Sequence, residues 1–269
     1  VDIICSIPTT QANYLSSVDG VTVVGQPSTR VVWLQFNTIN GDSPVNDLKV
    51  RQALNYAVDR DSLIAGVLDG YAVKVASIST PEYNDYDASV QGYTYDPEKA
   101  KSLLAEAGYP DGFTVDLSVS GGLLNATDVA QAVASQLAEV GVTVNIQQED
   151  SATQRDKIMS GTVAPIFLNG LGGPYCDIDL IASIGFTKGA RYCTWDSAEF
   201  VNLASRAAAA VDDTERAQLH SEMQQFMVDQ APAVWLYQQD TLYAYNSAKV
   251  QNWMARTDEV VLMDGVSVQ

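Results

Sequence analysis

Histidine, cysteine and basic residues are scarce in this chain of 269 residues. It has one histidine and three cysteines, and its 15 Lys and Arg stand against 33 acidic residues, for a formal net charge of -18. Binding to nucleic acid or to an anionic membrane surface needs clustered Lys and Arg, and no basic run is present. No apolar run approaches the roughly 18 residues that span a bilayer. The composition therefore indicates a globular chain with a solvated acidic surface.

The single histidine limits the catalytic chemistry that is open to the chain. His220 falls within a predicted helix beside Arg216 and Glu222, where we expect a surface position. A Ser-His-Asp or Cys-His system would have to be built around this one residue. GxSxG, HExxH and phosphate-loop motifs are absent, and Cys and His lack the spacing of metal ligands. We therefore predict a protein that is not an enzyme and that holds no metal or cofactor.

Two of the cysteines, Cys176 and Cys193, flank a glycine-rich stretch. A disulfide between them is predicted, with two free buried thiols as the alternative. Such a bridge would fit an oxidising compartment. Asp177 and Asp179, two residues apart, could bind Ca²⁺ or perform acid–base chemistry, although a solvated turn is the simpler interpretation.

Helices and strands alternate along the chain. Residues 31–37 are predicted as a strand of mixed period, and residues 48–68 as a single helix with a buried stripe at three-and-four spacing. Residues 71–95 are irregular and rich in tyrosine. Asp96 is an N-cap for the next helix, which Gly108 ends.

Two helix–glycine–strand units in a row, residues 98–119 and 127–148, predict an α/β sheet with helices packed on it. Further strands are expected at residues 164–168, 233–237 and 241–245, and further helices at residues 151–160, 197–210 and 214–230.

The candidate binding site is the glycine-rich loop of residues 169–175, which directly follows a predicted strand. Loops beyond the carboxyl ends of strands are where open α/β sheets bind small molecules. The glycines would allow close approach of a ligand, with a plain tight turn as the alternative. Aromatic side chains suited to stacking, each also typical of a core, are Trp33, Tyr83, Tyr175, Tyr192 and Trp195.

Several segments resemble one known family. After Asn37 and Pro44, residues 50–60 read VRQALNYAVDR, and residues 95–109 read YDPEKAKSLLAEAGY. These runs, with Gly141 to Val144 and residues 213–234 further on, are similar to motifs of the family 5 extracellular solute-binding proteins. That family provides the peptide, nickel and oligosaccharide receptors of ABC importers.

The resemblance implies a two-lobed clamp of the periplasmic-binding-protein type II fold, of which this chain is the second lobe, a mixed sheet flanked by helices. Residues 1–28 would be a remnant of the first lobe with the crossover, residues 29–237 the ligand-binding lobe, and residues 238–269 the return to the first lobe. The N-terminal portion of the same protein is expected to be missing. Its location would be periplasmic or extracellular, with lipid anchoring left open, and its partners a solute and a membrane permease.

The glycine-rich loop departs from the peptide-binding pattern of that family. Peptide-binding members carry a "GW..D" turn here, whose carboxylate grips the amino terminus of the peptide. This chain has Leu171 in place of Trp and Pro174 in place of Asp, and Asp177 could substitute. The departure weakens the dipeptide hypothesis and favours a neutral ligand such as an oligosaccharide, and the scarcity of histidine disfavours nickel.

The predicted function is capture of a peptide or another small polar solute for an ABC importer. Arg51 is expected to hold the lobe together. The alternatives are a carboxylate-dependent hydrolase that uses Asp177 and Asp179, and a sensor or adhesion module without a transporter. The residues expected at the ligand are Trp33, Tyr83, Asn169, Gly172, Gly173, Tyr175, Asp177, Arg191, Tyr192 and Trp195.

Overall fold

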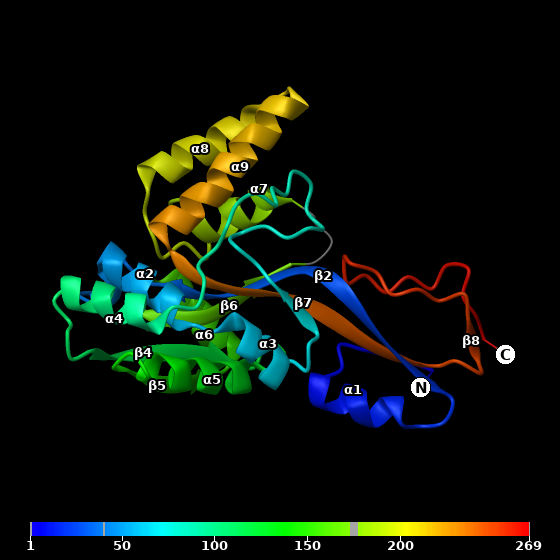
Figure 1. Ribbon diagram of the computed structural model, residues 1–269. Helices are drawn as coiled ribbons and strands as arrows, with labels where there is room; N and C mark the ends of the chain where they lie inside the picture. The colour runs from blue at the N-terminus through cyan, green and yellow to red at the C-terminus, as the bar shows by residue number, and fades with distance from the viewer. Residues whose placement is uncertain (1, 40, 173–176, 269) are drawn as a thin grey trace.

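The computed structural model describes residues 2–39, 41–172 and 177–268, and within them one sheet runs through the whole molecule (Figure 1). Its strands are β1 (Ile3–Cys5), β2 (Val21–Phe36), β3 (Ala72–Lys74), β4 (Phe113–Ser120), β5 (Val142–Glu149), β6 (Ile166–Leu171) and β7 (Ala233–Asn246). A separate short pair is formed by β8 (Val250–Gln251) and β9 (Ser267–Val268).

The sheet is mixed, as predicted. Its strand order is β1-β7-β2-β6-β4-β5, with β3 also paired to β7. Strand β4 lies parallel to both β5 and β6, whereas β1, β2, β3 and β7 join their neighbours in antiparallel pairs. The carboxyl ends of β4, β5 and β6 therefore meet at one edge of the sheet.

Helices cover both faces of this sheet (Figure 1). On one face, α2 (Leu48–Ala57), α4 (Pro97–Glu106) and α5 (Ala126–Ala138) contribute to a large aliphatic core, with α3 (Arg60–Val67) beside them. On the other, α7 (Ile178–Ile181), the π turn Ala182–Phe186, α8 (Ala198–Ala209) and α9 (Asp213–Gln230) enclose an aromatic core. The remaining helical elements are α1 (Thr9–Ser16), the 3₁₀ turn Pro44–Asn46 and α6 (Ser151–Met159).

The two cores explain the mixed period of the strand predicted at residues 31–37. Val32 and Leu34 pack into the aliphatic core, whereas Val31 and Trp33 pack into the aromatic core. A strand that is buried on both faces needs apolar side chains at successive positions, so it shows no alternation.

Local capping signals are confirmed, with one correction. The Asp96 carboxylate accepts a hydrogen bond from the amide of Lys99 at 2.9 Å and begins α4. The prediction of one helix over residues 48–68 is wrong, because α2 ends at Ala57 and a second helix begins at Arg60. There Asp59 accepts a hydrogen bond from the amide of Ser62, so it acts as a new N-cap in the middle of the predicted helix.

Strands β2 and β7 form a long two-stranded ribbon that reaches from the large body to a smaller one built from α1, β1, β8 and β9 (Figure 1). The two strands predicted at residues 233–237 and 241–245 are one continuous strand, which corrects that prediction. The pairing runs from Val21 opposite Asn246 to Gln35 opposite Ala233, with a bulge between Pro27 and Val31. The lobe boundaries expected after residues 28 and 237 fall beside this bulge.

Arg51 holds the large body together, as expected. The residue is 6% exposed, and its guanidinium donates to the carbonyls of Val45 and Asn46 on one side and of Gln230 and Ala231 on the other. It thereby joins the start of α2 to the end of α9.

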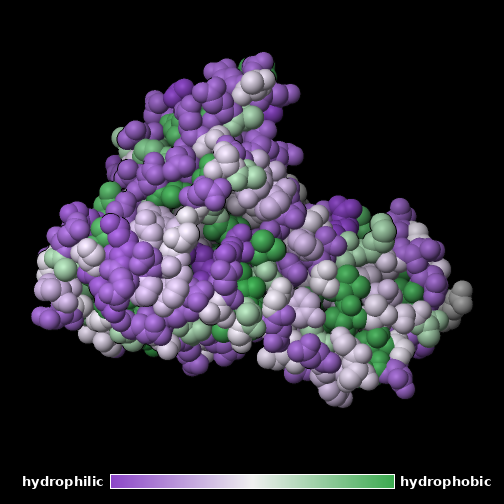
Figure 2. All heavy atoms as spheres, in the orientation of Figure 1, coloured by the Kyte–Doolittle hydropathy of each residue, from purple (hydrophilic) through white to green (hydrophobic). Residues whose placement is uncertain are grey.

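Hydrophilic atoms cover much of the visible face of the large body, and hydrophobic atoms surface near the ribbon and on the smaller body (Figure 2). Large apolar side chains that are exposed in the C-terminal segment include those of Val261, Leu262 and Met263. Among the described residues, the helices are too short or too polar to cross a bilayer.

Candidate functional site

A hollow of about 260 Å³ lies at the carboxyl ends of β4 and β6, beside the first turn of α6. Two of the residues predicted at the ligand, Asn169 and Tyr192, line it. The polar and charged side chains that line it are those of Arg30, Ser120, Ser151, Gln154, Arg155, Asn169 and Tyr192. This is the edge of an open α/β sheet at which small molecules bind, so we take it as the candidate site.

Gln35 holds the far wall of this hollow in place. Its fully buried side-chain oxygen lies 3.1 Å from Trp33 Nε1 and 3.1 Å from Asn169 Nδ2, and accepts a hydrogen bond from each. Its amide donates to the carbonyl of Tyr192 at 2.8 Å. The sequence prediction missed this role, although a glutamine inside an apolar run that is buried on both faces was a signal for it.

Asn169 and Gly172 both shape the backbone at the end of β6. The Asn169 side-chain oxygen accepts a hydrogen bond from the amide of Gly170 at 2.9 Å. A Cβ atom added at Gly172 would lie 2.4 Å from Cα of Arg30, so residue 172 must be glycine for this backbone to pass β2. The close approach that the sequence assigned to a ligand is therefore made here by the protein's own backbone.

Three of the aromatic residues expected to stack on a solute are core residues instead. Trp33 is 0% exposed, and its ring centroid lies 5.5 Å from that of Trp235. Trp195 and Tyr83 are each 4% exposed, and the Tyr83 hydroxyl donates to the carbonyl of Thr29 at 2.9 Å. The expectation of stacking is wrong for these three, because the aromatic core between the sheet and α7–α9 takes up their faces.

Other predicted site residues are accessible or lie outside the described residues. Asp177 and Arg191 are exposed, and the Arg191 guanidinium lies 5.9 Å from the ring centroid of Tyr192. Gly173, Tyr175 and Cys176 lie outside the described residues, so their roles and the Cys176–Cys193 disulfide stay predictions. Cys193 is half-buried, and burial raises the pKa of its thiol.

His220 is not on the surface, which corrects the sequence prediction. Its side chain is 2% exposed and lies between two carboxylates, with Nδ1 3.1 Å from Asp85 and Nε2 3.0 Å from Asp179. Burial alone would lower the pKa of His220, but the hydrogen bonds and charges of Asp179 and Asp85 raise it above the ordinary value. The helical pattern could not reveal this, because Asp85 and Asp179 are both distant in sequence.

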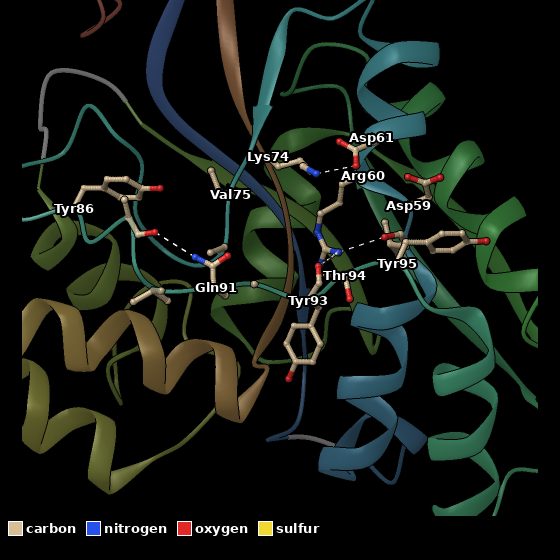
Figure 3. A pocket seen from close by; sticks show the side chains of 15 residues that line it. Asp59, Arg60, Asp61, Lys74, Val75, Tyr86, Gln91, Tyr93, Thr94 and Tyr95 are labelled. Atoms are coloured by element: carbon tan, nitrogen blue, oxygen red, sulfur yellow. Dashed lines mark hydrogen bonds and ion pairs between the residues drawn. The ribbon is translucent and has the colours of Figure 1, made fainter.

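A second hollow, of about 360 Å³, lies between β3, the start of α3 and residues 86–95 (Figure 3). Its cationic groups are already engaged within the protein. Lys74 pairs with Asp61 at 2.7 Å, and the buried Arg60 guanidinium donates to Asn55 and to backbone carbonyls that include those of Trp235 and Tyr93. Burial lowers the pKa of Arg60 to about 10. We therefore regard Arg60 as a structural support.

Comparison with known proteins gives a consistent result. Residues 1–191 match the model of bacterial extracellular solute-binding proteins, family 5. The chain is 33% identical over 223 residues to the dipeptide-binding protein of Escherichia coli K12, and the match covers 80% of this chain and 41% of that protein. It is 31% identical over 267 residues to a glutathione-binding protein of Pectobacterium atrosepticum, with 94% and 50% covered.

Solved structures share the fold. A dipeptide-binding protein from Pseudoalteromonas sp. SM9913, in complex with Met-Leu, aligns with a TM-score of 0.88 and 24% identity over 100% of this chain and 54% of that one. This chain therefore spans about half the length of the proteins that it resembles. The expected fold class, one lobe of a two-lobed periplasmic-binding-protein fold, agrees with these matches.

Proposed function

Because the chain belongs to the bacterial extracellular solute-binding proteins of family 5, we propose that it forms one wall of a clamp that captures a small polar solute for an ABC importer. The whole protein would act in the periplasm or at the outer side of the cytoplasmic membrane and deliver its solute to a membrane permease. The family is one of solute receptors rather than of enzymes. The observation that carries the proposal is the hollow at the carboxyl ends of β4 and β6.

The charge of this hollow favours a solute with an anionic group. Arg30 and Arg155 both line it, whereas its lining among the described residues includes no Asp or Glu. Because the Arg30 guanidinium is paired with Glu259, Arg155 is the guanidinium that the hollow offers to a solute. In a chain of net charge -18, a hollow lined by arginine and by no carboxylate is unusual. A guanidinium binds a carboxylate with two parallel hydrogen bonds, so a peptide or a peptide-like acid suits the hollow better than a neutral oligosaccharide.

The β2–β7 ribbon is the proposed connection between the two lobes. Residues 29–237 would carry the ligand wall, and the segments before and after them would belong to the first lobe. Solute held by both lobes would stabilise the closed clamp. Asp177 and Arg191, which are exposed, and Tyr192, which is half-buried and lines the hollow, would contribute from the same side of the clamp.

A thermal-shift panel tests the proposal. The chain, and the full-length protein that contains it, are melted with dipeptides, glutathione and neutral oligosaccharides. A solute at one hundred times its Kd should stabilise the folded state by about 2.7 kcal/mol, which raises the Tm by several degrees. Stabilisation by peptide-like acids alone is the expected result.

The variant Arg155→Gln should lose most of this shift. Its matched control is Arg206→Gln, which removes the same charge from the exposed side of α8. A full-length protein that no solute stabilises would contradict solute capture, and hydrolysis of the added peptides lost in Asp177→Asn would favour a hydrolase.

A further inference from the structure

The surroundings of His220 pose a chemical requirement. Both ring nitrogens face a carboxylate oxygen, at 3.1 Å for Asp85 and 3.0 Å for Asp179. A neutral imidazole donates from one nitrogen and accepts at the other, and a carboxylate can only accept. One of the two contacts therefore needs a positive species between the nitrogen and the oxygen, which is either a second proton or a metal ion.

The geometry beyond this contact provides further ligands. One oxygen of Asp177, one of Asp179 and one ring nitrogen of His220 lie within 4.8 Å of one another. Asp179 is in α7 and Asp177 is its N-cap, which places two carboxylates at the start of one short helix opposite His220 of α9. The Asp177 Oδ1 atom accepts the amide of Asp179 at 2.8 Å, which orients the carboxylate and leaves its other oxygen available.

Asp85 occupies the position of an outer partner. A histidine that binds a metal through one nitrogen usually donates the other N–H to a carboxylate, which fixes the tautomer and the ring orientation. The Nδ1 contact with Asp85 has this form and directs Nε2 toward Asp179.

Room for water ligands is present beside these groups. A hollow of about 520 Å³ is lined by Asp85, Asp177 and Asp179, together with Asp213 and Arg216. Arg216 pairs with Asp213 at 2.7 Å and lies 3.5 Å from Asp85. It does not pair with Asp177 or Asp179, and neither do the other described Lys and Arg residues. The hollow therefore keeps a negative charge that attracts cations.

We propose that Asp177, Asp179 and His220 bind one divalent cation of the Zn²⁺ type, with Asp85 orienting the histidine and water completing the coordination. One nitrogen and two carboxylate oxygens suit Zn²⁺, whereas Ca²⁺ and Mg²⁺ prefer oxygen ligands throughout. Bonds of about 2.0–2.1 Å in a tetrahedron place ligand atoms about 3.3 Å apart. Small side-chain rotations bring atoms within 4.8 Å to that spacing. Binding releases whatever proton His220 carries on Nε2.

The bound cation would fasten α7 to α9. Asp177 and Asp179 were recognised in the sequence as possible cation ligands, but His220 was not, because it is 41 residues from Asp179 and no short motif contains both. None of Asp177, Asp179 and His220 lines the hollow at β4 and β6, so the cation does not need a solute there in order to bind.

Isothermal titration of the purified chain with ZnCl₂ tests the proposal. All variants carry Cys5→Ser, so that the exposed thiol of Cys5 contributes nothing. One Zn²⁺ per chain is expected. His220→Gln should abolish binding, and Asp85→Asn should weaken it by about 10-fold to 100-fold. Because His220 is buried and its variant could fail to fold, Asp177→Asn is the decisive change: asparagine preserves the N-cap of α7 but offers a weaker ligand.

The matched control is Asp213→Asn, which removes one negative charge from the same hollow without removing a proposed ligand. Its Zn²⁺ affinity should stay within about twofold of the parent, as expected for a screened surface charge. Absence of Zn²⁺ binding in the parent chain would overturn the proposal and leave a proton as the occupant of the contact. Equal loss of affinity in Asp177→Asn and Asp213→Asn would overturn it too, because the attraction would then be one of general charge. The titration contains no solute, so its failure leaves the proposed function untouched.

Discussion

Arg30 and Glu259, 229 residues apart in the chain, form a bidentate ion pair. Nε of Arg30 lies 3.0 Å from Oε1 of Glu259, and Nη2 lies 2.7 Å from Oε2. The side chains are 26% and 22% exposed. Arg30 belongs to the bulge of the ribbon and also lines the candidate hollow. The pair therefore connects the C-terminal segment to the wall of the proposed ligand site.

Glu259→Gln should release this segment at a modest cost in stability. The loss of a bidentate pair that is about three-quarters buried is expected to lower the free energy of unfolding by about 1 kcal/mol. Hydrogen exchange should become faster in residues 252–266 and stay unchanged in α5. Glu98→Gln, which removes a pair with a largely exposed carboxylate, is the control and should change neither measurement.

Gly172→Ala should destabilise the protein, because the new Cβ would lie 2.4 Å from Cα of Arg30 and the backbone must shift. A cost of about 1–3 kcal/mol is expected in urea denaturation. Gly66→Ala provides the matched control, since nothing lies within 4 Å of the added Cβ and the residue is inside α3. That change should increase stability by about 0.5–1 kcal/mol. Equal effects of the two changes would contradict the steric explanation.

Gln35→Ala should lower the free energy of unfolding more than the same substitution at a surface glutamine. It leaves the buried Nε1 of Trp33 and the Nδ2 of Asn169 without their acceptor and opens a small cavity. About 2–4 kcal/mol of unfolding free energy should be lost, with a change in the tryptophan near-UV circular dichroism. Gln218→Ala, on the exposed face of α9, should have little effect on either.

Asp240→Asn should stabilise the protein at neutral pH. Burial, and then the charge of Glu82, raise the pKa of Asp240. An acid with a raised folded-state pKa is less readily ionised in the folded chain. The protonated Asp240 therefore favours the folded state. This stabilisation is fully present below the pKa of the unfolded chain and is lost as the pH rises through the pKa of the folded chain.

The gain in Asp240→Asn, on the order of 0.5 kcal/mol after solvent screening, should be present at about pH 7 and disappear well below about pH 4. Urea midpoints at the two pH values measure it. Asp42→Asn, at an exposed position, is the control. A gain that persists at the lower pH would show that ionisation is not its cause.

Features that depend on neighbouring residues could be predicted from the sequence. The Asp96 cap, the start of α4 at Pro97 and the parallel arrangement of β4 and β5 follow from local signals and from short connections. Asp59 shows the limit of such signals, because an aspartate in an apolar stripe reads equally well as a surface residue of one helix or as the cap of a second.

Features that depend on distant contacts could not be predicted. Trp33, Tyr83 and Trp195 carry no local mark that distinguishes a core ring from one that faces a ligand, and the difference arises from packing under α7–α9. The same holds for His220, whose two partners approach from separate segments. The candidate hollow lies at the end of β6, beside the predicted binding loop, because the position of such a loop follows from sheet topology. Solute binding at this place stays a prediction.

The β2–β7 ribbon determines how stiffly the two bodies of the molecule are coupled. Backbone hydrogen bonds join the strands on both sides of the bulge, and Ser28 Oγ bonds the carbonyl of Gln239 at 2.7 Å within it. The two strands therefore cannot slide past each other without breaking this ladder. A pleated pair bends readily across its flat face and resists bending in its plane, so relative motion of the bodies would flex and twist this ribbon. It would also load the contacts beside the ribbon, which are the Arg30–Glu259 pair and the hydrogen bond from Asn125 Nδ2 to Thr9 Oγ1 at 3.0 Å. The torsional stiffness of the ribbon with these contacts, and not the length of a loose tether, would set the energy of domain rotation.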